Sequence, residues 1–191
     1  MTTPFQQDVD EALLGRARQG EAAAQTELFR LFGRAVYTLA RRLLVKPELA
    51  EDVLQDTFVE VLRNLPSFRA EAPFGMWLRR IAVNRCLMHL RSPWQRHRLA
   101  LDEESGAAAP QGADPGFDVL DMERALEALP PEARAVVWLH DVEGYTHQEI
   151  GRLLNASTSF SKSQLARAYV RLRHWAEPQT GESPCTPVLS N

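Results

Sequence analysis

Side chains able to read DNA are concentrated between residues 157 and 171. The polar, cationic and aromatic residues on the expected outer face of this segment are Ser159, Phe160, Lys162, Ser163, Gln164, Arg167 and Arg171. Hydroxyl, amide and guanidinium groups can hydrogen-bond to base edges, and arginines can also hold phosphates. No Asp or Glu occurs between Ile150 and Ala176, whereas a solvated helix face usually mixes both signs. We therefore favour DNA binding over an ordinary amphipathic helix.

Two helices joined by a short turn are expected to position these residues. Thr146 and Glu149 have the T-x-x-E spacing of a capping box, which starts a helix at a defined residue. Asn155 tolerates the left-handed backbone that ends many helices, and Ser157 can cap the next helix. The residues of the second helix expected to pack inward are Leu165, Tyr169 and Leu172. The segment thus has the outline of a helix-turn-helix, which binds duplex DNA.

A second candidate surface is the polar face of a helix expected over residues 47–65. Its residues are Glu48, Asp52, Gln55, Asp56 and Glu60. Acids four residues apart on a helix repel each other by about 0.2 to 0.5 kcal/mol per pair. A cationic partner docking on this face would explain the arrangement. On spacing alone, a simply solvated acidic face is an equally good interpretation.

A third candidate surface combines aromatic and cationic residues between residues 66 and 91. The surface also includes one amide, Asn84. Its residues are Phe68, Arg69, Phe74, Trp77, Arg80, Asn84 and Arg91. Bases of single-stranded nucleic acid stack on aromatic rings while cations hold the backbone. The competing interpretation is a purely structural role for these residues. It is strong for Trp77, which also suits an apolar core, and weaker for Arg80 and Asn84.

The hydrophobic periodicity predicts an all-α fold. The expected helices cover residues 9–19, 21–44, 47–65, 75–91, 118–128 and 131–144, followed by the helix-turn-helix. The segment between 92 and 118 lacks periodicity and is rich in Ala, Gly and Pro, which is typical of a linker. The predicted organisation is two small helical domains, 1–92 and 118–177, an acidic flexible linker, 93–117, and a disordered tail, 178–191.

Composition and charge exclude several functional classes. The chain has 191 residues, 45% hydrophobic and 25% charged, which is ordinary for a soluble globular protein. Its net charge of -3 hides six arginines without an acid between residues 75 and 101, then five acids without a base between 102 and 118. The N-terminus lacks a signal sequence and no long apolar run occurs, so we expect a cytoplasmic protein without membrane insertion.

The sequence also contains no arrangement typical of an enzyme. Cys86 and Cys185 form neither a metal-ligand spacing nor a disulfide framework. The histidines are scattered along the chain, at His89, His97, His140, His147 and His174. No nucleophile and base pair and no phosphate-binding loop occurs. We therefore predict no enzymatic activity, no catalytic residue, no metal site and no cofactor.

Three motifs, in this order, resemble the extracytoplasmic-function (ECF) sigma factors of the sigma-70 superfamily. They are ELAEDVLQDTF at 48–58, FGMWLRRIAVNRCLMHLR at 74–91, and EGYTHQEIGRLL at 143–154 followed by STSFSKSQLARAYVRLR at 157–173. The resemblance implies a sigma region 2-like domain, then a linker, then a sigma region 4-like domain. It implies an alternative sigma factor that binds core RNA polymerase and directs promoter recognition, melting at the -10 element and transcription initiation.

The resemblance also implies roles for the three candidate surfaces. The acidic helix would bind the clamp helices of the largest polymerase subunit, and the polymerase flap region is a further expected partner. The loop at 66–74, with Arg80 and Asn84, would melt the -10 region and capture a flipped base. The helix from Phe160 to Arg171 would read the -35 element as duplex. The linker would thread the polymerase active cleft and RNA exit path, and an anti-sigma factor is an expected partner.

The sequence departs from the usual pattern of this family at three positions. Met88 stands where an Asp is common, Phe160 where a small residue is usual, and Asn155 where the turn commonly has Gly. The first two departures affect which promoter is read and leave the functional class unchanged.

Two other classes of protein remain as alternatives. One is a conventional helix-turn-helix regulator that binds duplex DNA without polymerase, with an N-terminal ligand-binding or dimerisation domain. The other is an enzyme with an appended DNA-binding domain, which would need a pocket of perturbed ionisable groups. Binding to core polymerase separates the sigma factor from the first alternative.

Overall fold

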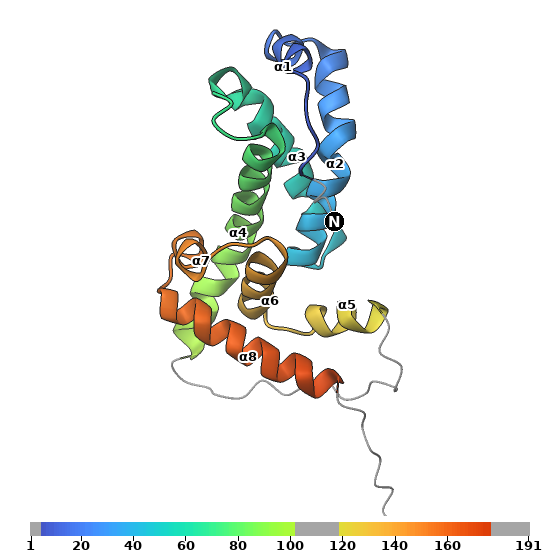
Figure 1. Cartoon of the computed structure of the whole chain (residues 1–191). Coiled ribbons are helices and arrows are strands. Elements are labelled where there is room, and N and C mark those ends of the chain that lie inside the picture. Colours follow the sequence, from blue (N-terminus) through green and yellow to red (C-terminus); the bar gives the residue numbers. More distant parts are fainter. Residues whose placement is uncertain (1–4, 102–118, 177–191) are drawn as a thin grey trace, which may run out of the picture.

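A computed structural model describes the backbone of residues 5–101 and 119–176, and the side chains of residues 5–90 and 122–175. Within these ranges the regular structure is entirely helical, as predicted (Figure 1). In the first domain the helices are α1 (Glu11–Arg18), α2 (Ala22–Leu44), α3 (Pro47–Asn64), the short 3-10 helix η1 (Leu65–Ser67) and α4 (Phe74–Leu101). In the second they are α5 (Val119–Glu127), α6 (Pro131–Val137), the π-helix η2 (Trp138–Val142), α7 (His147–Leu154) and α8 (Thr158–Ala176).

The first domain is built on mutual packing of α2, α3 and α4, with α1 against α2. Helix α2 supplies Leu28, Phe32 and Leu43, which are all fully buried. Helix α3 begins with a proline in its first turn, where the missing N–H has no helical partner to lose. The packing leaves one face of α3 and one side of the N-terminal half of α4 at the surface. The candidate residues lie there.

The segment before α1 crosses the start of α4 and is anchored by Phe5, which is 4% exposed. At the crossing, the Phe5 carbonyl lies so close to Gly75 that a β-carbon on that residue would overlap it. Gly75 is therefore required by the close approach of two backbones.

The second domain begins its helix-turn-helix as predicted. The Thr146 hydroxyl accepts from the Glu149 N–H at 3.3 Å, while the Glu149 carboxylate accepts from the Thr146 N–H at 2.8 Å. Asn155 ends α7 in the left-handed conformation, with φ of 52°. The Ser157 hydroxyl accepts from the Phe160 N–H at 3.0 Å and so caps α8.

Two expectations about the helices were wrong. We expected Pro93 to end the helix, but α4 continues through it to Leu101. A proline can be accommodated within a helix at a cost, and the residues after Pro93 favour helix. The rest of the expected linker, at 102–117, and the tail at 178–191 lie outside the described residues. Tyr169 was expected to pack inward, but it is 42% exposed and its hydroxyl donates to Asp141 at 2.9 Å.

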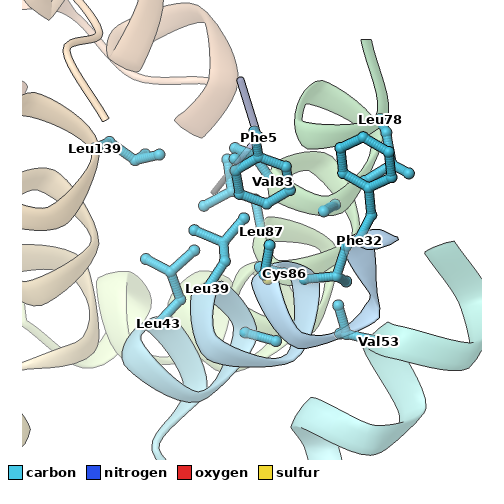
Figure 2. Close-up of a cluster of buried hydrophobic side chains, with 14 of the residues drawn as sticks. Phe5, Phe32, Leu39, Leu43, Val53, Leu78, Val83, Cys86, Leu87 and Leu139 are labelled. Atoms are coloured by element: carbon cyan, nitrogen blue, oxygen red, sulfur yellow. The ribbon is translucent and has the colours of Figure 1, made fainter. Parts of the chain in front are cut away.

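The two domains share one continuous apolar core. Leu139 of the second domain is fully buried in the same cluster as Phe5, Leu39 and Val83 of the first, and Figure 2 shows these side chains around a common interior. In Figure 1, α6 and α7 lie beside α4. No helix in the described part of the chain is long and apolar enough to cross a membrane.

Candidate nucleic-acid and protein interfaces

The first candidate interface is the exposed face of α3. Glu48, Asp52, Gln55 and Asp56 are all exposed there, and we call these four residues the acidic surface. Val59 lies on the same face, four residues after Gln55, and is 56% exposed. The centre of a protein interface is more apolar than its rim, so a partner that docks on the acids would also cover Val59. Sequence reasoning had missed Val59, because an isolated valine on a helix usually belongs to the core.

Glu60, predicted as part of the same surface, is placed differently. Its carboxylate pairs with Arg85 of α4 at 2.5 Å, and both side chains are about one-third exposed or less. The pair neutralises Glu60 and offsets the repulsion expected between Asp56 and Glu60. Glu60 therefore joins α3 to α4 and contributes less charge to the acidic surface than its spacing indicated.

The second candidate interface is a pair of adjoining hollows beside the N-terminal half of α4. One hollow has a volume of about 280 Å³, the other about 320 Å³, and Ser67, Trp77 and Arg80 line both. Arg69 and Glu71 line the first, and Asn84 lines the second. An aromatic ring, two arginines and an amide thus line two adjoining hollows, together with the acids Glu71 and Glu60.

Aromatic packing shapes this site from beneath. Phe74 is 5% exposed and packs edge-on against Phe32 and Phe68, with ring centroids 5.5 and 5.6 Å apart. Phe68 is 9% exposed and lies 4.9 Å from the Trp77 ring. Phe74 therefore supports the loop from the core, and Trp77, only half-buried, offers the accessible ring. The side chain of Arg91 lies outside the described residues.

The loop before α4 is held by a residue that sequence reasoning missed. Arg18, at the end of α1, donates to the carbonyl oxygens of Leu65 and Phe68, at 3.4 and 3.1 Å. Its own guanidinium also pairs with Glu11 at 2.8 Å. The helix dipole already accounts for a basic residue in the last turn of a helix. The sequence therefore did not predict that Arg18 would contact a loop 47 residues away.

The third candidate interface is the outer face of α8. Ser159, Lys162, Arg167 and Arg171 are exposed, and Ser163 and Gln164 are half-buried. Phe160 packs in part against the core, so it contributes less to this face than predicted. The turn before α8 is tight because Gly151 has no side chain: a β-carbon there would approach the Ala156 carbonyl to 2.9 Å.

A buried polar contact fixes the crossing of α7 and α8. Ser161 is fully buried and its hydroxyl lies 3.0 Å from His147 Nδ1. The His147 ring stacks on His140 with centroids 4.5 Å apart. Burial lowers the pKa of His147, and the neighbouring His140 and Lys162 lower it further. Both histidines thus have structural partners, and the described residues contain no group of three or more ligands that could hold a metal ion.

Comparison with known proteins identifies two family domains in this chain. Sigma-70 region 2 matches residues 28–96, and Sigma-70, region 4 matches residues 120–172. The ECF RNA polymerase sigma factor SigM of Mycobacterium tuberculosis is 36% identical over 163 residues, which cover 85% of this chain and 82% of SigM. The chain belongs to the ECF RNA polymerase sigma factors. It is also 27% identical to the ECF RNA polymerase sigma-E factor of Escherichia coli, over 91% of this chain and 97% of that protein.

Solved structures show the same fold. The sigma factor RpoE of Bartonella quintana, solved with the anti-sigma factor NepR, superposes with a TM-score of 0.52 at 23% identity, over 78% of this chain and 94% of that one. CnrH, solved with the cytosolic domain of CnrY, superposes with a TM-score of 0.50 at 25% identity, over 87% and 96%. This sigma factor is an alternative initiation factor that binds core RNA polymerase and promoter DNA. It is not an enzyme, as the sequence predicted.

Proposed function

We propose that three separate surfaces divide the work of this sigma factor. The acidic surface of α3 binds the clamp helices of the largest polymerase subunit. The hollows at Trp77 and Arg80 capture an unpaired base of the -10 element, and the outer face of α8 reads the -35 element as duplex.

The hollow at Trp77 and Arg80 is the observation that carries this proposal. Extruding a base from duplex DNA costs a few kcal/mol, and stacking it on an aromatic side chain returns about 1 to 3 kcal/mol. The half-buried Trp77 ring supplies such a stacking partner, with the exposed Arg80 beside it for a phosphate or base edge. A conventional helix-turn-helix regulator reads closed duplex and has no use for a base pocket in another domain.

The charge of the other two surfaces supports the same division. No ion pair within the described part of the chain neutralises Glu48, Asp52 or Asp56, so they are available to a cationic protein. The outer face of α8 carries cations and hydrogen-bonding groups without an acid. Such a face attracts DNA phosphates and places side chains at base edges.

The test compares duplex and premelted promoter templates. Arg80→Ala and Asn84→Ala should leave recruitment of polymerase to the promoter intact but reduce permanganate reactivity of the -10 thymines on duplex DNA. Premelted templates should recover most transcription, because their bases are already unpaired. Arg30→Ala, an exposed arginine of α2 outside the three surfaces, is the matched control and should behave as wild type. Equal loss on both templates, with the fold intact by circular dichroism, would contradict the role in melting.

Partners and location follow from the same assignment. We propose that the protein acts in the cytoplasm, where core polymerase is found, and that its second domain also contacts the polymerase flap region. The solved relative RpoE is bound to the anti-sigma factor NepR, and we propose that an anti-sigma factor of comparable action regulates this chain.

A further inference from the structure

The proposed base pocket of this sigma factor depends on a loop that buries only its first side chain. The loop runs from Phe68 to Pro73, between η1 and α4. Phe68 is 9% exposed, and residues 69–73 are all exposed. Ala70 has a left-handed backbone, with φ of 54°, and a residue with a β-carbon adopts this conformation at an energetic cost. Contacts from outside the loop therefore have to hold its conformation.

Arg18, the last residue of α1, supplies such contacts. Its Nε donates to the Leu65 carbonyl oxygen at 3.4 Å, and its Nη2 donates to the Phe68 carbonyl oxygen at 3.1 Å. Its Nη1 donates to Glu11 Oε1 at 2.8 Å. In Figure 1, α1 lies at the end of the first domain where this loop emerges. Because each guanidinium nitrogen has a partner within the protein, Arg18 acts on the loop and is not a DNA ligand.

The two carbonyls that Arg18 binds belong to η1 and to the residue that follows it, so their position fixes the wall of the pocket. The Phe68 N–H also donates to the Leu65 carbonyl oxygen, at 3.2 Å. The Phe68 ring lies 4.9 Å from the Trp77 ring, and Phe68 itself lines the first hollow. Ser67, the last residue of η1, lines both hollows. A shift of these carbonyls would therefore move the pocket wall and the ring that supports Trp77.

We propose that Arg18 is a positioning residue for base capture: it holds the loop so that the pocket discriminates the captured base, without touching that base. The proposal rests on the proposed function of the hollows at Trp77 and Arg80. Arginine is required because its planar fork reaches two carbonyls at once, whereas the lysine ammonium is a point charge on a flexible stem. The ion pair with Glu11 contributes little, since the Glu11 side chain is 71% exposed and exposed ion pairs are weak.

The test measures how strongly the binding of holoenzyme to premelted DNA depends on one base. The templates derive from a promoter that the holoenzyme transcribes, and they carry an abasic nucleotide at each non-template position of the -10 element in turn. With the wild-type chain, an abasic nucleotide at the captured position should weaken binding about 5- to 150-fold, which is the value of one stacked base. Abasic nucleotides at the other positions should weaken binding less.

Arg18→Lys should lose most of this discrimination. Its affinity for the template with the intact base should fall about tenfold, because loss of the charged donors lowers the fraction of correctly placed loops. Its affinity for the template that is abasic at the captured position should equal that of wild type. The matched control is Arg16→Lys on the same helix, since Arg16 pairs with Glu21 and Glu27, which lie outside the loop. This control should behave as wild type, and so should Glu11→Gln, which leaves both carbonyl contacts in place.

A second measurement follows the loop in the free, full-length chain. Trypsin can cut after the exposed Arg69, and a loosened loop is cut faster. Arg18→Lys keeps the same tryptic sites and should be cut after Arg69 faster than wild type, while circular dichroism shows that it is folded.

Two results would show that Arg18 does not position the loop. They are unchanged cleavage after Arg69 in Arg18→Lys, and an equal loss of affinity for the intact and abasic templates, which a general loss of stability would cause. If Arg18→Lys keeps the wild-type discrimination at a sensitive position, the positioning role is refuted and the base pocket stands. If no position is sensitive with the wild-type chain, the base pocket is itself refuted, and the role of Arg18 with it.

Discussion

Replacing two arginines of α8 one at a time should produce two different kinds of DNA-binding defect. Arg167 and Arg171 are both exposed on the outer face and are four residues apart, which is about 6 Å along the helix axis. The N-terminal part of a recognition helix enters the major groove most deeply. Arg167 is therefore expected to reach a base edge, and Arg171, one turn later, a phosphate.

The expected magnitudes follow from these positions. Neither side chain is buried, so alanine should leave the fold intact. Loss of a bidentate base contact costs about 1 to 3 kcal/mol, a factor of about 5 to 150 in Kd. Arg167→Ala should lose this factor on the preferred -35 sequence and much less on altered sequences. Loss of one phosphate contact lowers the slope of log K against log salt by about 0.9. When the salt concentration rises from 50 to 200 mM, the affinity of Arg171→Ala should therefore fall about 3.5-fold less than the affinity of wild type.

The assay is a fluorescence anisotropy titration of both variants against a set of -35 duplexes at several salt concentrations. Holoenzyme is used, because in it the recognition helix is presented as in initiation. If the two variants lose sequence preference and salt dependence to the same extent, the recognition helix does not lie in the groove as we infer.

Two further predictions concern the first domain. Asp52→Arg combined with Asp56→Arg should abolish competition for core polymerase, because reversal of the acidic surface repels a basic partner. The charge-matched control Asp8→Arg with Glu27→Arg, two exposed acids outside α3, should compete as wild type, and equal competition by both variants would contradict the polymerase site. Gly75→Ala should destabilise the first domain, because the backbone crossing leaves no room for a β-carbon. Overpacking of this kind lowers the free energy of unfolding by about 1 to 3 kcal/mol. Denaturant titration measures this free energy, and an unchanged transition midpoint would show that the N-terminal segment is not held at that crossing.

Local signals in the sequence predicted the helix-turn-helix well. The capping box at Thr146, the left-handed Asn155 and the Ser157 cap all occur as expected. Each depends on contacts within a few residues, so the sequence nearby contains the necessary information. The exposed acids of α3 were also predicted, because helical periodicity alone assigns them to one face.

Features that depend on tertiary contacts could not be predicted in this way. The Arg85 partner of Glu60 is 25 residues away, and the Arg79 contact with Glu143 spans 64. Spacing along a helix assigns a charged residue to a face but does not say what covers that face. Arg79 therefore counted as one of six arginines in a basic segment, whereas the structure buries it between the domains.

We propose that this chain directs core RNA polymerase to promoters through the acidic surface and the two DNA sites. Run-off transcription with purified core polymerase, the full-length chain and a library of promoter fragments tests this proposal. We predict transcripts from a subset of fragments that share -35 and -10 elements, present with the wild-type chain and absent with D52R/D56R. Tight binding of promoter duplex by the chain alone, with transcription by core polymerase independent of the chain, would contradict this function.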